Sequence, residues 1–203
     1  HNRYPVAWAR ANREAVEEAG ALGDAVFFMR AGYTGTSRHS LGAWAGDQLV
    51  NWSRNDGLPT VIPAAISAGF SGTGVHHSDI GGFTTVAWVR RSKELFLRWA
   101  EQAAFTPITR SHEGNRPGSN WQFDSDEETL AHLARMTNVY ARLEPYHRHT
   151  VSTYANSGLP AIRHVALHYG DDEQTHTLSY QYLYGRDLLV APVVRRNMNS
   201  WPV

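Results

Sequence analysis

The sequence predicts an α/β fold: the C-terminal half of a (β/α) TIM-type barrel that runs into the first strands of a β-sandwich. Three observations support this. Helical segments alternate with short apolar segments along the chain. Polar residues that could take part in chemistry follow the apolar segments, as they do in barrel enzymes. The 203 residues hold about four strand–helix units, whereas a full barrel takes about 250 residues. We expect the barrel part over 1–170 and the sandwich part over 171–203.

Apolar spacing and turn residues predict the individual elements. Helices repeat apolar residues every three or four positions, and strands are short apolar segments bounded by glycine or proline. The expected helices cover 4–19, 60–69, 92–104 and 125–155. The expected strands cover 25–30, 70–77, 105–109, 160–169 and 188–194, with 178–184 either a strand or the end of a helix.

Capping residues mark several of these helix ends. Gly20 and Gly158 follow helical patterns, and glycine readily adopts the left-handed conformation that ends a helix. Ser92 is an expected N-cap. Ser125 and Glu128 have the spacing of a capping box, which predicts the start of the fourth helix.

Composition and charge exclude several classes of protein. Nineteen basic and nineteen acidic residues cancel, so the chain lacks the positive charge of a nucleic-acid-binding protein. It contains no cysteine and hence no disulfide or thiolate nucleophile. No apolar segment approaches the roughly 20 residues of a membrane span. Because the chain starts at His1 inside a helical pattern, we expect a piece of a larger enzyme. The lack of cysteine permits the cytosol or the periplasm, and we expect a bacterial cytoplasmic location. Its main partner would be the upstream half of the barrel in the same enzyme, and a homo-oligomer is possible.

The segment 44–52 carries the candidate acid. Asp47 lies between Trp44 and Trp52, shortly after the apolar segment 25–30. A carboxylic acid in a dry aromatic pocket keeps its proton, because burial disfavours the charged form. Such a group suits the general acid that a sugar leaving group needs. The alternative is that Asp47 only caps a backbone turn.

Three further polar residues, Arg30, Asp79 and His112, follow the first three expected strands. Such groups can bind sugar hydroxyls through charge-assisted hydrogen bonds. Each has a structural alternative: a salt bridge for Arg30, a helix cap for Asp79 and an ordinary loop position for His112. Together with Asp47 they are four polar residues expected at the same end of the barrel strands, which favours a functional interpretation.

A metal site is not expected. The pair His76–His77 resembles a zinc ligand set, but adjacent strand residues point to opposite faces and cannot both bind one ion. No organic cofactor is expected either. Among the tryptophans, Trp121 is expected nearest the site, beside Arg116 and Asn120.

Four motifs, in the same order along the chain, resemble glycoside hydrolase family 31. They are Trp44–Asp47, Ser78–Phe83, Arg110–His112 and Tyr180–Val193. The family contains retaining α-glucosidases and relatives. The resemblance implies that Asp47 is the general acid/base and that Arg30, Trp44, Asp79 and His112 belong to the sugar-binding site. It also implies that the nucleophilic Asp lies upstream, because no residue here matches it.

Within the family, the segment 106–123 looks like the sulfoquinovosidases. Ordinary α-glucosidases lack the insertion Glu113–Pro117. Sulfoquinovosidases release sulfoquinovose, a 6-sulfonated glucose, from sulfolipid-derived α-sulfoquinovosyl glycerides. Phe83 matches a position where these enzymes can carry a tyrosine that helps to hold the sulfonate, and Phe lacks the hydroxyl. The alternatives are an α-glucosidase or α-xylosidase of the same family, and a non-catalytic carbohydrate-binding relative or inactive fragment.

Overall fold

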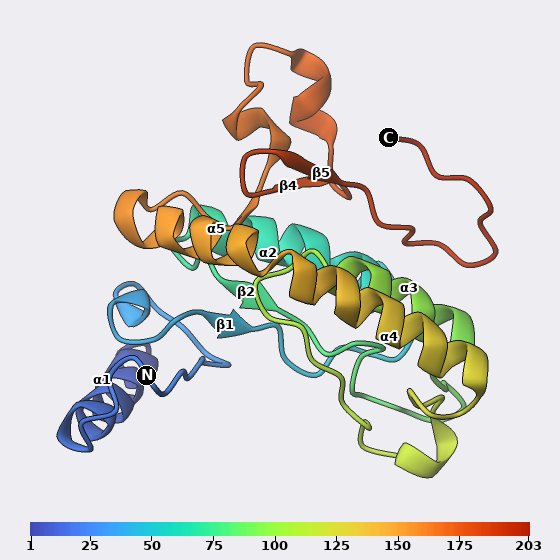
Figure 1. The fold of residues 1–203 in the computed structure, drawn as a ribbon, viewed down its shortest axis with the longest axis horizontal. Coiled ribbons are helices and arrows are strands. Elements are labelled where there is room, and N and C mark those ends of the chain that lie inside the picture. The colour runs from blue at the N-terminus through green and yellow to red at the C-terminus, as the bar shows by residue number, and fades with distance from the viewer.

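The computed structural model describes residues 1–203 as a mixed α/β structure (Figure 1). The helices are α1 (Tyr4–Glu18), α2 (Val61–Phe70), α3 (Lys93–Ala103), α4 (Glu127–Arg142) and α5 (Glu144–Ser157). The strands are β1 (Ala43–Trp44), β2 (His76–His77), β3 (Ile162–Arg163), β4 (Tyr182–Tyr184) and β5 (Leu188–Val190). None of the helices combines the length and the apolar character that crossing a membrane requires.

Four extended segments lie side by side in parallel and correspond to barrel strands. Met29 pairs with Ala43, β1 pairs with β2, and Ile80 pairs with Ser111. The pairing therefore runs from the segment around residue 29 through β1 and β2 to the segment around residue 111. Because all four segments run in one direction, their carboxyl ends lie on the same edge of this parallel sheet.

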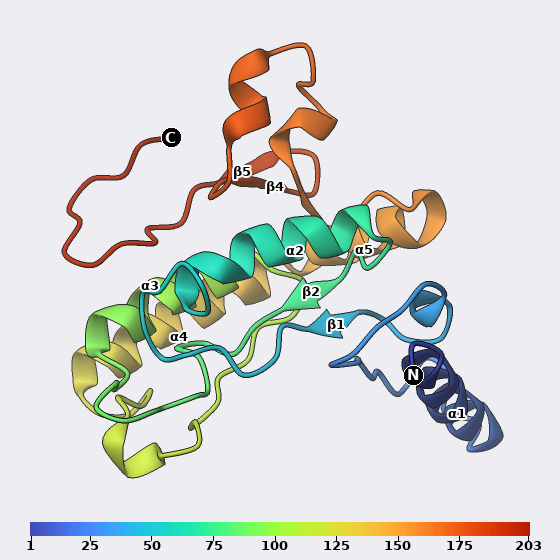
Figure 2. The same cartoon turned by 180° about the vertical axis from the view of Figure 1, so that it is seen from behind.

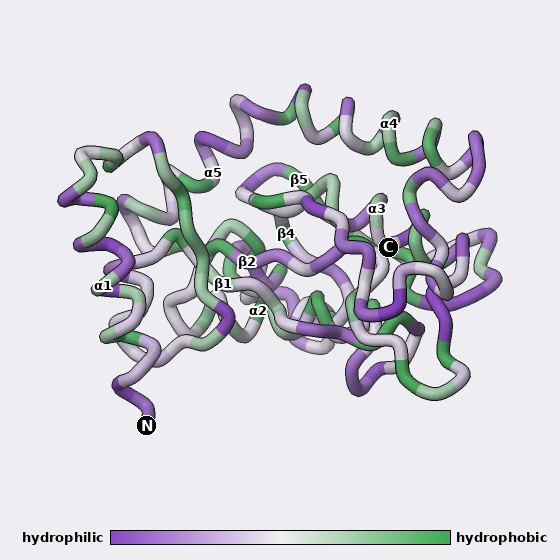
Figure 3. Tube along the Cα trace, turned by 90° about the horizontal axis from the view of Figure 1, so that it is seen from below, coloured by the Kyte–Doolittle hydropathy of each residue, from purple (hydrophilic) through white to green (hydrophobic).

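Helices α2 to α5 lie on one side of these parallel segments, and β4 and β5 lie beyond the helices (Figures 1 and 2). Apolar residues of α2 and α3 form half of the core, with Ile62, Phe96 and Trp99 fully buried. Each fully buried side chain of this size contributes about 1.5–3 kcal/mol. Figure 3 shows apolar and polar residues alternating along α4, as expected for a helix with one face on the core. Helices on the outside of parallel strands are the arrangement of one part of a (β/α) barrel.

The C-terminal part contains a second sheet, in which β4 lies between β3 and β5 and all pairs are antiparallel. The segment 160–169, expected in the barrel part, therefore contributes its strand to an antiparallel pair and not to the parallel segments. Tyr182 and Tyr184 of β4 are fully buried. The Tyr182 hydroxyl donates to the Phe105 carbonyl at 3.0 Å, and the Tyr184 hydroxyl lies 2.5 Å from His147 Nδ1. These bonds join the second sheet to the helical layer.

Several helix ends agree with the prediction and one does not. Ser92 caps α3 by accepting from Leu95 N–H at 3.3 Å, and Gly158 ends α5 with φ 77°. The Ser125–Glu128 capping box is wrong: Asp126 caps α4 and accepts from Thr129 N–H at 2.7 Å. The single helix expected over 125–155 is two helices. The break comes at residue 143, just before a proline in the first turn of α5, because proline cannot continue the preceding hydrogen-bond pattern.

The strands are shorter than predicted. The segment 25–30 lies at the edge of the parallel ladder, and Val26 is 69% exposed, so this is not a buried strand. Within 70–77 only β2 is extended, since α2 continues to Phe70. The segment 105–109 contains no strand, and 160–169 contributes only β3. The short strand β1, which glycines flank, was not predicted.

Candidate active site

Side chains from the parallel segments meet at their shared carboxyl edge. Arg30 Nη2 donates to Asp47 Oδ2 at 3.1 Å. The guanidinium groups of Arg30 and Arg110 lie 5.4 and 5.1 Å from the centre of the Trp44 ring. Arg110 Nε in turn donates to Asp79 Oδ1 at 2.7 Å. We call these five residues, Arg30, Trp44, Asp47, Asp79 and Arg110, the rim cluster.

Asp47 is held at the rim by its backbone. Gly46 has φ 92°, a conformation that other residues rarely adopt, and turns the chain directly after Trp44. The Thr84 hydroxyl donates to the Asp47 carbonyl at 2.7 Å. The Asp47 side chain is 35% exposed and pairs with Arg30. The dry pocket between two tryptophans is therefore not formed by this chain, because Trp52 packs against the core instead.

A second carboxyl lies near Asp47. The pKa of Asp56 is raised, first by its partial burial and then by the negative charge of Asp47. The Asp56 carbonyl also accepts from Leu49 N–H at 2.7 Å, which holds the two segments together. Asp56 is thus a natural comparison residue for tests of Asp47.

Asp79 is fully buried and takes part in the site through Arg110. Arg110 donates to Asp79 Oδ1 from both Nε and Nη2, which is a fixed geometry for a guanidinium group. Asp79 Oδ2 has no hydrogen-bond partner within the chain. Buried carboxylate oxygens are nearly always satisfied, so a donor from a ligand, water or another part of the enzyme is expected.

Arg110 is a site residue that the sequence interpretation used only as part of a motif. Besides Asp79 and Trp44, it lies 5.5 Å from the Phe28 ring. Phe28 in turn meets His77 edge-on at 4.5 Å. Burial lowers the pKa of His77 to about 4, and the positive charge of Arg110 acts in the same direction. A neutral imidazole with no hydrogen-bond partner therefore lies beneath the rim cluster.

His112 stands beside the rim cluster on the loop after the fourth parallel segment. Its Nδ1 accepts from Gly114 N–H at 3.1 Å, so in the neutral ring the proton is on Nε2. Phe83 meets the imidazole edge-on at 4.8 Å. Nε2–H is therefore the donor that His112 can offer to a ligand.

The loop 112–122 is clamped against the segment 82–91 by Arg91, which the sequence interpretation missed. Arg91 is buried and donates to the carbonyls of Gly82 at 3.0 Å and His112 at 2.9 Å. Burial lowers the pKa of Arg91 to about 10, while Asp79 acts in the opposite direction. The only local signal was its position directly before the cap Ser92. Arg91 holds the loop that carries His112 in place.

The same loop leaves two predicted residues outside the rim cluster. Arg116 is exposed and forms no ion pair with Asp124. Trp121 donates from Nε1 to Thr129 at 2.9 Å and packs against the core. Trp121 therefore braces α4 and is not a member of the rim cluster, whose tryptophan is Trp44. No three histidine, aspartate or glutamate side chains lie close enough together to hold a metal ion.

Comparison with known proteins identifies the family. The TIM-barrel domain of glycosyl hydrolases family 31 matches residues 1–149, and the C-terminal domain of this family matches residues 158–203. The chain belongs to glycoside hydrolase family 31. This confirms the predicted fold class, part of a TIM barrel followed by the start of a C-terminal domain. The exact division at residues 170 and 171 stays a prediction.

Two curated relatives and one solved structure are most informative. The chain is 57% identical over 201 residues to the sulfoquinovosidase of Escherichia coli (strain K12), covering 99% of this chain and 30% of the relative. It is 51% identical to the sulfoquinovosidase of Agrobacterium fabrum, covering 95% and 29%. The structure of a family 31 sulfoquinovosidase from E. rectale, in complex with an aza-sugar inhibitor, matches with a TM-score of 0.96, 50% identity and coverage of 99% and 30%. The chain thus spans about a third of the length of these relatives.

Proposed function

We propose that the enzyme containing this chain is a retaining α-glycoside hydrolase that releases sulfoquinovose from sulfolipid-derived α-sulfoquinovosyl glycerides. The observation that carries the proposal is the 57% identity to a sulfoquinovosidase over 99% of the chain. Relatives named α-glucosidase and α-xylosidase are 32% and 27% identical, which makes them the less favoured alternatives.

In the proposed mechanism, Asp47 is the general acid/base. It first donates its proton to the oxygen of the leaving group while a carboxylate from another part of the enzyme attacks the anomeric carbon. It then takes a proton from the water that hydrolyses the glycosyl–enzyme bond. Arg30, whose Nη2 lies 3.1 Å from Asp47 Oδ2, holds the carboxyl group in one orientation.

The other rim residues would position the sugar. Trp44 offers an aromatic surface between the guanidinium groups of Arg30 and Arg110, and His112 offers Nε2–H. Asp79 would act by fixing Arg110. Each of these arginines is already paired with a carboxylate, so we expect the main donors to the sulfonate, which keeps its charge at neutral pH, to come from the part of the enzyme outside this chain.

The substrate preference is tested with the full-length enzyme. We expect kcat/KM for an aryl α-sulfoquinovoside to exceed that for the aryl α-glucoside by about 10⁴, because a site built for a polar group rejects the analogue that lacks it. A ratio near one would move the assignment to a general α-glucosidase. Binding of both sugars without turnover of either would favour the non-catalytic alternative.

The role of Asp47 is tested with Asp47→Asn. The amide cannot donate a proton, so hydrolysis of substrates with poor leaving groups should fall by about 10²–10⁴. The first step with an activated aryl glycoside should lose much less, since that group leaves without protonation. Asp56→Asn, a change at the neighbouring carboxyl, is the control and should leave this contrast unchanged. Equal loss in the first step for both leaving groups would show that Asp47 is not the acid.

Three expectations about the whole protein accompany the proposal. The segment around Met29 is an unpaired parallel edge, so residues 1–203 expressed alone should be insoluble or require the rest of the enzyme. A soluble monomer with a cooperative melt would contradict this. A bacterial cytoplasmic location and a homo-oligomer stay predictions, which cell fractionation and light scattering would test.

A further inference from the structure

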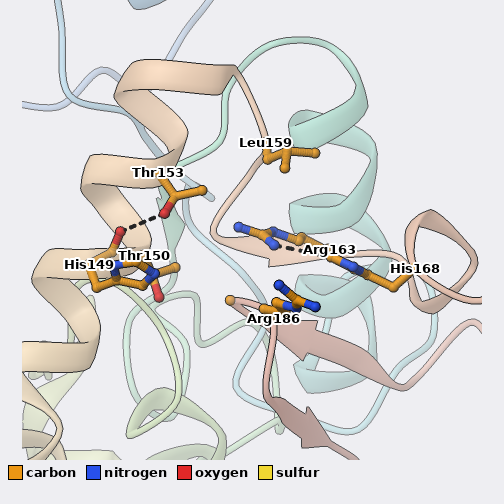
Figure 4. Close-up of a pocket in the computed structure, with 8 residues that line it drawn as sticks. His149, Thr150, Thr153, Leu159, Arg163, His168 and Arg186 are labelled. Atoms are coloured by element: carbon orange, nitrogen blue, oxygen red, sulfur yellow. Dashed lines mark hydrogen bonds between the residues drawn. The ribbon is translucent and has the colours of Figure 1, made fainter.

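A polar cavity lies between α5, β3 and the turn that joins β4 to β5 (Figure 4). Its volume is about 350 Å³. Its polar lining consists of His149, Thr150, Thr153, Arg163, His168 and Arg186. No member of the rim cluster contributes to it.

The cavity contains positive charge without a matching carboxylate. Arg163 and Arg186 both line the cavity (Figure 4), and neither forms an ion pair. Arg163 is only 3% exposed. Its Nε donates to the Pro160 carbonyl at 2.6 Å and its Nη1 lies 3.1 Å from His168 Nε2. A buried cation is normally paired, so this arrangement calls for an anion.

The nearest carboxylate does not supply that anion. Asp187 follows Arg186 in the chain and is exposed. Its Oδ2 accepts from the Tyr146 hydroxyl at 3.4 Å and makes no ion pair with either arginine. Burial, Arg163 and Arg186 all lower the pKa of His168, with Asp187 acting in the opposite direction. Burial lowers the pKa of Arg163, while Tyr146 and Asp187 act in the opposite direction, so Asp187 influences the cavity without forming an ion pair there.

The wall formed by α5 has an unsatisfied polar group. Thr150 is 1% exposed and its Oγ1 has no hydrogen-bond partner. The hydroxyl faces Gly185, where a Cβ would come within 2.8 Å of it. Buried hydroxyls are rarely left without a partner. Because Thr150 Oγ1 is inaccessible, the hydroxyl that a ligand can reach on α5 is that of the half-buried Thr153, which donates to the His149 carbonyl at 2.8 Å.

We propose that this cavity is a second ligand site, which binds a small hydroxylated molecule carrying a sulfonate or phosphate group. The anionic group would lie between Arg163 and Arg186, because tetrahedral oxyanions match the fork of donors on a guanidinium group. The hydroxylated part would lie toward Thr153. The volume is at the small end of ligand sites, which begin at about 300 Å³, and so fits a compact molecule.

The first test measures anion binding to the full-length enzyme by calorimetry at constant ionic strength. The probes are sulfate and inorganic phosphate, with chloride as the reference. Arg186→Ala should weaken binding about tenfold or more, because a charge-assisted hydrogen bond to the anion is lost. Arg196→Ala removes another exposed arginine, outside the cavity, and should change the affinity by less than about twofold.

The second test identifies the source of the anion. The affinities for glycerol phosphate and for a hydroxypropanesulfonate should each be compared with the affinity for sulfate. The organic anion that binds more tightly identifies the ligand class. Thr153→Val should reduce this advantage over sulfate, since valine keeps the shape and lacks the hydroxyl. A rise in the pKa of His168 on binding, followed by NMR, would place the anion in the cavity.

Three results would overturn the proposal. One is equal sulfate affinity in the natural enzyme and Arg186→Ala. Another is no advantage of either organic anion over sulfate. The third is a crystal structure of the full-length enzyme with a carboxylate from another part of the chain between Arg163 and Arg186.

Discussion

In the rim cluster each arginine pairs with a carboxylate, whereas neither of the two arginines that line the C-terminal cavity does. Arg30 pairs with Asp47 and Arg110 with Asp79 at the ends of parallel segments. Arg163 and Arg186 lie beside an antiparallel sheet and have no carboxylate partner. Paired charges hold side chains in one geometry before a substrate arrives, which a catalytic site needs. Unpaired positive charges can instead be neutralised by an anionic ligand.

The two rim pairs also differ from each other in burial. The Asp79 side chain is fully buried and that of Arg110 is 32% exposed. The side chains of Arg30 and Asp47 are 62% and 35% exposed. Water and salt screen the second pair, so it contributes to positioning more than to stability. Substitutions can separate these roles.

The largest effect is expected at the buried pair. Asp79→Ala leaves Arg110 without its partner and should lower the free energy of unfolding by about 3–5 kcal/mol. Arg30→Ala should cost at most about 1 kcal/mol, because its pair is exposed. Urea unfolding of the full-length variants measures both. Similar losses for the two variants would contradict the distinction between a buried and an exposed pair.

Acid should destabilise the region beneath the rim next most strongly. Burial lowers the pKa values of His76 and His77 to about 4, from an ordinary value of 6.5. Below pH 6.5 the unfolded chain takes up protons that the folded chain does not, so stability falls as the pH falls toward 4. Between pH 7 and pH 5 the loss should be about 2 kcal/mol per histidine.

Urea midpoints at pH 8, 7 and 5 test this pH dependence. Only about 0.1 kcal/mol per histidine is expected between pH 8 and pH 7, where these side chains are mostly neutral in both states. The double substitution His76→Asn and His77→Asn should reduce the loss between pH 7 and pH 5. An unchanged loss in the double variant would assign it to other groups.

Alanine substitutions at Gly81 and Gly72 separate the cost of backbone strain from the cost of contact with Arg91. Gly81 and Gly72 have φ 85° and 82°, so alanine should cost about 1–2 kcal/mol at either position from strain alone. A Cβ on Gly81 would lie 2.6 Å from Arg91 Cδ, whereas one on Gly72 meets nothing within 4 Å. Gly81→Ala should therefore cost about 1–3 kcal/mol more, and should raise KM by displacing the loop that carries His112. Thermal unfolding and kinetics check this, and equal costs would show that Arg91 moves aside freely.

The smallest predicted effect concerns helix caps. Ser92→Ala removes the cap of α3 and should cost about 1 kcal/mol. Ser125→Ala should cost less, because Ser125 Oγ accepts only an exposed turn hydrogen bond from Gln122 N–H, which water can replace. Denaturant midpoints of the two variants compare them directly. A larger loss at Ser125 would restore the capping-box interpretation.

The sequence was sufficient for features that depend on neighbouring residues or on the order of motifs. The end of α5 at Gly158 and the start of α3 at Ser92 are local capping effects. Polar residues placed after successive apolar segments predicted the shared rim, and Arg30 and Asp47 do meet there. Motif order was enough to predict the family, because the four motifs span nearly the whole chain.

Only the tertiary structure determined which groups pair across long separations. Asp79 and Arg110 are 31 positions apart, and Arg91 and the His112 carbonyl are 21 apart. No local periodicity encodes such contacts. The sequence analysis therefore named Arg110 only as part of a family motif and did not name Arg91. The same holds for the antiparallel pairing of β3, β4 and β5 and for the cavity beside it, since strand direction depends on where the chain returns. Local sequence sets where an element ends, and the packing of distant segments decides which charges meet.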